Sequence, residues 1–185
     1  MALPATLYDF DVALEHVDRA LHQRVQLKVA RHPSETLPRM WLRVVAYLWL
    51  YEERLRMGPG ISDPDAPDLL ADDLTGQLTL WVRVGRLDPV KLEREADRNA
   101  RARIAAGFES AERLDAFVEA ARVAGVKRLA RAELFAPDGA LLQALAAADE
   151  RRTKASVTIV GDHLYVQRGV ESLDGPLARR SLAPP

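Results

Sequence analysis

Asp68 and Arg83 are the residues of this chain whose types and spacing bear most directly on chemistry. Asp68 follows Pro67 in a turn-rich segment, and fourteen residues separate it from Arg83, near the end of a strand-like run. A carboxylate at the edge of a strand can share a divalent ion with a carboxylate on the neighbouring strand. Glu35, at the start of a predicted helix, could complete such a set. The chemistry would be metal-assisted hydrolysis of a phosphodiester.

The positive charge at position 83 works against that chemistry. Two unit charges about 4 Å apart interact by roughly 4 kcal/mol at an effective dielectric constant of 20, so an arginine beside a divalent ion costs about 8 kcal/mol. A guanidinium can instead clamp Asp68 or Glu35 through two hydrogen bonds, or hold a phosphate or another oxyanion directly. In a third arrangement, Glu93 or Glu95 on the following helix supplies the missing carboxylate. The sequence leaves all three open.

Each of these residues also has a purely structural interpretation. Glu35 in the first turn of a helix interacts favourably with the helix dipole, and Pro-Asp is a common turn dipeptide. Arg83 shares a strand face with Trp81 and could extend into solvent. His32 is more typical of a structural histidine than of a ligand, and the other three histidines lack metal-ligand spacing.

Composition indicates one soluble globular domain. The chain has 185 residues, 48% of them hydrophobic and 29% charged, with a formal net charge of -1. The absence of cysteine excludes disulfides, thiolate zinc sites and cysteine nucleophiles. The longest apolar run, 44–51, is far shorter than the roughly 20 residues of a spanning helix. With no secretory signal at the N-terminus, we expect a cytoplasmic protein with no membrane contact.

The hydrophobic periodicity predicts an α/β fold, with a central mixed β-sheet flanked by helices and antiparallel strands at its ends. Ser34 is the expected N-cap of the first long helix. We expect one domain over residues 1–168 and an irregular tail over 169–185. The predicted strands are 5–17, 24–30, 77–85, 102–108, 127–135, 153–160 and 163–168, and the predicted helices are 34–57, 88–100, 110–124 and 138–149.

Residues 30–36, which read Ala-Arg-His-Pro-Ser-Glu-Thr, resemble the hallmark segment of the YaeQ family of bacterial proteins. The likeness covers most of residues 1–108 and fades toward the C-terminus. The resemblance implies a variant of the PD-(D/E)XK nuclease fold, the restriction-endonuclease-like fold, in a family of unestablished role. Further segments that carry the likeness are Arg39-Met40, Arg43, 53–55, 60–62, 67–68 and 80–85.

Carried over residue by residue, the resemblance places the nuclease-like positions at Glu35, Asp68 and residue 83. The family usually has glutamate at the third position, where this chain has Arg83. Gly85 stands where orthodox nucleases of this fold carry lysine, as is usual in the family. The family tends to carry basic residues on the next helix instead, where this chain offers Lys91 and Arg94.

Two functional hypotheses follow from this pattern. In the first, the nuclease-like site is degenerate, and the protein is a non-catalytic binding or regulatory protein without a cofactor. In the second, it is a Mg²⁺- or Mn²⁺-dependent phosphodiesterase acting on nucleic acid, with Glu35 and Asp68 as metal ligands and Lys91 or Arg94 as the catalytic cation. The partner would be nucleic acid or another protein, and the oligomeric state is left open.

Basic residues are concentrated in two segments that could line a nucleic-acid groove. The range 83–103 holds seven basic residues against four acidic ones. A second cluster consists of Arg122, Lys127, Arg128 and Arg131. The alternative is that these are solvated helix faces, neutralised in part by intrahelical pairs such as Arg94–Asp97 and Lys91–Glu95.

Overall fold

The computed structural model describes residues 4–59 and 66–183 of the chain. Among these residues, ten strands form one mixed sheet in the order β2-β1-β8-β9-β10-β7-β6-β5-β4-β3. The neighbours β1 and β8 are parallel, as are β5, β6 and β7, and the other pairs are antiparallel. The strands are β1 (Thr6–His16), β2 (Leu21–Arg31), β3 (Arg56–Met57), β4 (Leu69–Asp72), β5 (Leu78–Val84), β6 (Arg103–Gly107), β7 (Glu133–Pro137), β8 (Arg152–Val160), β9 (His163–Arg168) and β10 (Glu171–Arg180).

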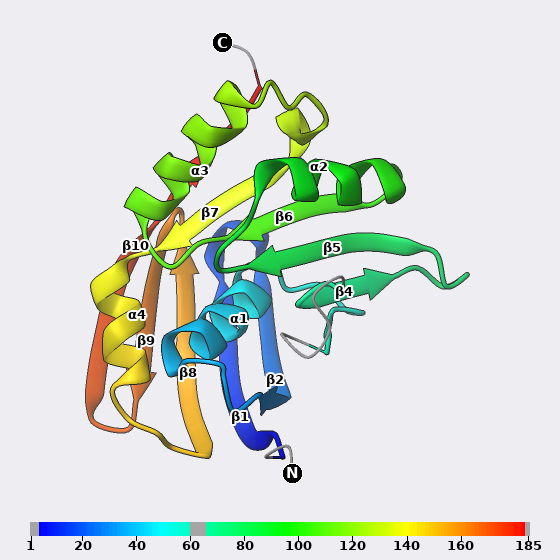
Figure 1. Cartoon of the computed structure of the whole chain (residues 1–185). Coiled ribbons are helices and arrows are strands. Elements are labelled where there is room, and N and C mark those ends of the chain that lie inside the picture. The colour runs from blue at the N-terminus through cyan, green and yellow to red at the C-terminus, as the bar shows by residue number, and fades with distance from the viewer. Residues whose placement is uncertain (1–3, 60–65, 184–185) are drawn as a thin grey trace.

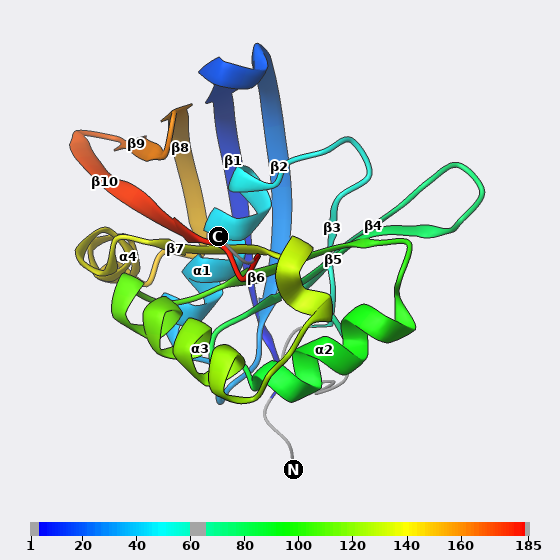
Figure 2. The ribbon, with the colours of Figure 1, turned by 90° about the horizontal axis from the view of Figure 1, so that it is seen from above.

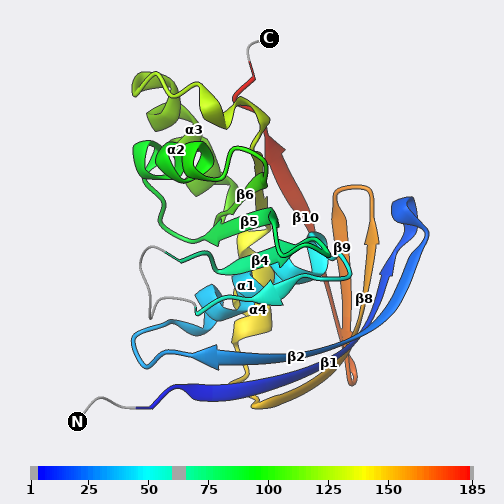
Figure 3. The same ribbon diagram turned by 90° about the vertical axis from the view of Figure 1, so that its right-hand side faces the viewer.

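The sheet curves strongly, so that its two halves lie on either side of the first helix (Figures 1 and 3). The helices are α1 (Leu37–Trp49), α2 (Pro89–Arg98), α3 (Ala111–Val123) and α4 (Gly139–Ala146), with short 3-10 turns η1 (Val17–Arg19) and η3 (Arg128–Arg131). Apolar residues of α1 at three-four spacing, among them Met40, Val44 and Leu48, are buried against strands of both halves. The main core therefore surrounds α1.

At β5, β6 and β7, helices cover both faces of the sheet (Figure 2). There α1 lies on one face, while α2 and α3 pack on the other around Trp81, Leu92 and Phe117. The predicted mixed sheet flanked by helices is thus present. No helix of residues 4–59 and 66–183 is long and apolar enough to cross a membrane.

The first helix is shorter at both ends than the predicted range 34–57. Its N-cap is Thr36, whose hydroxyl accepts from the amide of Arg39. The hydroxyl of Ser34, the expected N-cap, is paired with His32 at 2.7 Å. Pro38 in the first turn fixes the helical start. After Trp49 the chain leaves the helix, and Arg56–Met57 pair with β4 as an edge strand.

The prediction of an irregular tail from residue 169 is wrong. Glu171–Arg180 form β10, which pairs with β9 through its first half and with β7 through its second half. Gly175 and Pro176, which usually weaken a strand, stand where the pairing changes partner. A Cβ on Gly175 would lie 2.9 Å from the Cβ of Asp138 and 3.1 Å from that of Leu141, so glycine lets β10 approach α4.

Candidate functional site

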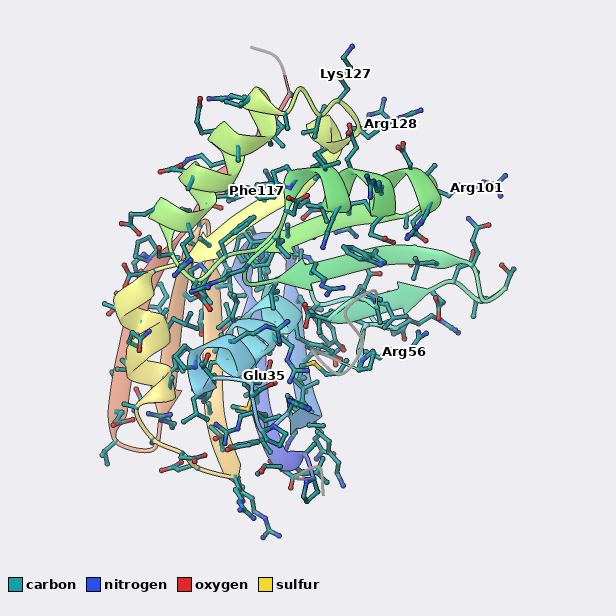
Figure 4. The ribbon with its side chains drawn as sticks, in the orientation of Figure 1. Glu35, Arg56, Arg101, Phe117, Lys127 and Arg128 are labelled. Carbon is teal, nitrogen blue, oxygen red and sulfur yellow. The ribbon has the colours of Figure 1, made fainter. Side chains whose placement is uncertain are left out.

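The two carboxylates predicted from the sequence, Glu35 and Asp68, lie close together and are buried. Each side chain is only 1% exposed. Glu35 precedes α1, where its amide donates to the carbonyl of His32 at 2.8 Å, and Figure 4 shows it at the beginning of that helix. Asp68 precedes β4, and its amide donates to the carbonyl of Val82 at 2.8 Å. A turn and a strand pairing therefore fix the two residues.

A single guanidinium, that of Arg39, bridges these carboxylates. Its Nη1 lies 2.5 Å from Oε1 of Glu35, and its Nη2 lies 2.8 Å from Oδ1 of Asp68. Arg39 follows Glu35 by four residues, the spacing that puts two side chains on one face of a helix. The fork of the guanidinium matches two separate oxygen acceptors. Arg39 thereby ties the start of α1 to the start of β4.

The other two carboxylate oxygens also have donors. Oε2 of Glu35 accepts from Nη2 of Arg43 at 2.8 Å, and the same nitrogen donates to the carbonyl of Ala30 at 2.8 Å. Oδ2 of Asp68 accepts from the amide of Val84 at 2.9 Å. All four oxygens are thus engaged, as buried carboxylates require.

Arg83 lies beside this cluster but does not bridge Glu35 and Asp68. Its Nε is 3.8 Å from Oδ2 of Asp68, and its Nη1 donates to the carbonyl of Ala66 at 2.5 Å. A guanidinium clamp on the carboxylates was one of the three arrangements that the sequence left open for Arg83; such a clamp is present, but Arg39 provides it. Gly85, with a φ of +96°, leaves room for Arg39, whose Nε would be 3.4 Å from a Cβ at that position.

The cluster as built does not fit a divalent metal ion. Every oxygen of Glu35 and Asp68 already accepts from an N–H group, and the guanidiniums of Arg39, Arg43 and Arg83 surround the pair. Cations this close oppose a second cation electrostatically. Within residues 4–59 and 66–183, no three histidine, aspartate or glutamate side chains are grouped so that they could hold a metal.

The glutamates suggested as replacement ligands are engaged elsewhere. Oε1 of Glu93 accepts from the amides of Lys127 at 2.6 Å and Arg128 at 3.0 Å, which links α2 to η3. These hydrogen bonds lower the pKa of Glu93, and the one from the amide of Arg128 has the larger effect. Glu95 pairs with Arg98 at 2.6 Å. Both glutamates are thus engaged away from Glu35 and Asp68, and neither belongs to a metal-holding group of the described residues.

Arg83 also lines a cationic cavity of about 390 Å³ between β5 and α2. Its basic residues are Arg83, Arg86, Lys91, Arg94 and Arg98, and its acidic residues are Asp88 and Glu95. Asp88 caps α2 through the amide of Lys91 at 2.8 Å.

The expected pairs Lys91–Glu95 and Arg94–Asp97 are wrong, since Glu95 pairs with Arg98 and Asp97 with Arg128. In the part of the chain that the structure describes, Arg86, Lys91 and Arg94 have no carboxylate partner.

The second basic cluster lies at the periphery of the same face. Figure 4 shows Lys127 and Arg128 beyond α2, pointing outward, and Arg101 just past the C-terminal end of that helix. Nε of Arg128 pairs with Asp97 at 3.0 Å. These residues flank the cavity but do not line it.

The YaeQ protein family matches residues 1–175 of the chain. The chain belongs to the YaeQ family. It is 37% identical over 101 residues to the protein named "Uncharacterized protein YaeQ" of Escherichia coli strain K12, a match that covers 54% of the chain and 55% of that relative. The relative of the same name from Salmonella typhi is 38% identical over 95 residues, 51% of the chain and 52% of that protein. The matched segment thus spans about half of these relatives.

Crystal structures of two YaeQ proteins share the fold. The protein from Xanthomonas axonopodis pv. citri has a TM-score of 0.86 at 24% identity, with 97% of this chain and 99% of that chain covered. The protein from Pseudomonas syringae has a TM-score of 0.85 at 29% identity, with coverages of 96% and 97%. The mixed α/β architecture with its curved sheet is therefore that of YaeQ proteins.

In this YaeQ family member, sequence reasoning found the carboxylates but not their partners. Arg39 and Arg43 carried part of the family likeness, yet neither was assigned a role in the site. A usable signal was present, because Glu35, Arg39 and Arg43 follow one another at intervals of four and so share one side of a helical segment. The ring of His32 contacts the hydroxyl of Ser34 at 2.7 Å. The family segment 60–62 lies outside the described residues.

Proposed function

We propose that this protein is a non-catalytic nucleic-acid-binding protein, built on a PD-(D/E)XK-type scaffold in which arginine side chains take the place of the metal ion. One observation carries the proposal. Arg83 stands between a carboxylate pair whose oxygens are all engaged and an open cavity lined by Arg86, Lys91 and Arg94. The first feature argues against metal-assisted hydrolysis, and the second provides cations for phosphate groups.

The phosphate backbone is the expected ligand of this cavity, because it presents negative charges at regular spacing and is bound through their neutralisation. The whole chain has a formal net charge of -1, so attraction must be local. The cavity supplies this local charge, since its two carboxylates are used by a helix cap and by Arg98. Arginine also offers paired donors suited to phosphate oxygens.

Fluorescence anisotropy with labelled 20-nucleotide single-stranded DNA, RNA and duplex DNA tests the binding. We expect log K to fall with log salt concentration with a slope of about -2 to -4, since each phosphate contact contributes about -0.7 to -0.9. Lys91→Gln and Arg94→Gln should each make the slope shallower by about one contact. Arg24→Gln, an exposed arginine on β2 away from the cavity, is the matched control. If no probe binds at low salt, the nucleic-acid proposal is wrong and a protein partner becomes the candidate.

Calorimetric titration of Mn²⁺ tests the absence of catalysis. We expect no saturable heat from the natural protein and no cleavage of the same DNA and RNA probes in Mn²⁺. Arg83→Glu, which restores the carboxylate usual in the family, is run in parallel with Arg39→Gln, which opens the bridge. Saturable binding by the natural protein, together with cleavage lost in Asp68→Ala, would establish the phosphodiesterase instead.

A further inference from the structure

A second polar cavity, of about 450 Å³, lies at the opposite end of α1 from the carboxylate pair. It is bounded by η1, by the turn between β8 and β9, and by the beginnings of β6 and β7. The residues that matter here are His16, Arg19, Trp49, Glu52, Glu133 and Arg179. None of them lines the cationic cavity beside Arg83. Its volume is within the range of small-molecule sites.

His16 is the least satisfied polar group in the wall of this cavity. The residue is 7% exposed, and its Nδ1 has no hydrogen-bond partner among the residues that the structure describes. Oδ2 of Asp18 lies 3.9 Å from that nitrogen, beyond hydrogen-bonding distance. Burial, and secondly the charge of Arg19, lower the pKa of His16, so the ring is neutral at pH 7. A buried polar atom of this kind calls for a partner.

An aromatic wall adjoins this nitrogen. The rings of His16 and Trp49 have centroids 5.8 Å apart and are tilted by 34°. Both side chains line the cavity. Indole beside imidazole offers a planar ligand ring a surface for stacking, with a hydrogen-bonding atom at its edge.

The charged residues of the cavity differ in how fully they are engaged. Arg103 is saturated, because Glu52 lies 2.9 Å from its Nη1 and Glu133 lies 2.9 Å from its Nη2. Arg19 donates to the carbonyl of Tyr51 at 2.8 Å and has no carboxylate partner in the described part of the chain. Arg179 donates a long hydrogen bond to Asp162 at 3.4 Å, and Asp18 accepts from the amide of Gly161 at 2.7 Å. Arg19 and Arg179 are therefore the guanidiniums that can receive an anionic group.

We infer that this cavity binds a nucleoside monophosphate. The base stacks on Trp49 and hydrogen-bonds to Nδ1 of His16 once the imidazole turns to expose that buried atom, and the phosphate is held by Arg19 and Arg179. Glu52 and Glu133 each direct one oxygen to Arg103, which leaves the other to accept from ribose hydroxyls. This inference is independent of the proposed nucleic-acid binding, because the two cavities share no lining residue.

Calorimetric titration of the full chain with AMP, GMP, CMP and UMP tests the inference. We expect at least one of them to bind with a dissociation constant below about 1 mM. His16→Phe keeps an aromatic ring but removes Nδ1, and Arg19→Gln removes one phosphate partner. Each should weaken binding about tenfold, the effect of one lost hydrogen bond in a dry site or to a charged group. Arg113→Gln, an exposed arginine of α3 outside the cavity, should leave binding unchanged.

Three outcomes would overturn it: no nucleotide binds at millimolar concentration, both cavity variants bind as the natural protein does, or inorganic phosphate binds as tightly as the nucleotide. Adenosine, which lacks the phosphate group, should bind more weakly than AMP. Because Arg19 is exposed, Arg19→Gln should fold even if His16→Phe does not. The test therefore does not depend on a substitution in the buried wall.

Discussion

Arg39 holds together two buried carboxylates that come from different layers of the fold, one at the start of α1 and one at the start of β4. A buried ion pair contributes little net free energy compared with an apolar substitute, because both partners lose their hydration. Removing Arg39 is different, since Glu35 would keep only Arg43, and Asp68 only the amide of Val84 and the more distant Arg83, with no water to replace the lost donor. The bridge therefore adds little net stability, but its loss would leave Glu35 and Asp68 buried without the partner they share.

Arg39→Ala should lower the free energy of unfolding by about 3–5 kcal/mol, because Glu35 and Asp68 would stay buried without their shared partner. Urea denaturation followed by circular dichroism measures the change. Arg39→Lys should recover only part of it, since an ammonium cannot present the planar fork. Arg98→Ala breaks an exposed helical pair and should cost no more than about 0.5 kcal/mol. Equal losses for the two alanine variants would contradict a structural role for the bridge.

The same residues show why the site was only partly predictable. Glu35 and Asp68 were reached through family likeness and spacing, which identify residue types. The contact between Arg39 and Asp68 joins segments distant in the sequence, and no local pattern specifies it. Arg83, singled out because its charge was unexpected, lies beside Asp68 but donates a hydrogen bond to the backbone carbonyl of Ala66.

At the scale of elements, the alternation of apolar and polar residues was the reliable signal. β1, β2 and β5 were predicted because apolar residues at every second position face the core. α1 was predicted too long, because apolar residues after Trp49 continued a helical pattern although the chain turns toward β3. β10 was missed because Gly175 and Pro176 interrupt its alternation, and only its pairing with β7 and β9 makes it a strand.

Gly175→Ala tests the packing of β10 against α4. The added methyl would lie 2.9 Å from Cβ of Asp138 and 3.1 Å from Cβ of Leu141, so the first turn of α4 must shift. Such overpacking should cost about 1–3 kcal/mol, measured by thermal or urea denaturation. Gly139→Ala is the matched control, because its Cβ would have no neighbour closer than 3.5 Å. A variant at 175 as stable as the control would show that the contact relaxes freely.

At the scale of the whole molecule, β10 joins the two groups of strands into one sheet. On one side it continues β2, β1, β8 and β9, and on the other β7, β6, β5, β4 and β3. Its backbone pairs with both neighbours, and Leu177 is buried in the main core. Without β10, neither β7 nor β9 would keep its central position, and each would present an unpaired edge.

A chain ending at Gly169 should therefore fail to fold, although a boundary near that residue was predicted from the sequence. The truncation removes the pairing of β10 with both β7 and β9, and it removes the contact between α4 and Gly175. We expect aggregation on expression, or a circular dichroism signal without a cooperative thermal transition. A chain ending at Leu182, which keeps β10 intact, should melt within a few degrees of the full chain. If the shorter chain melted cooperatively near the same temperature, residues 1–168 would be a complete folding unit, and β10 an addition to it.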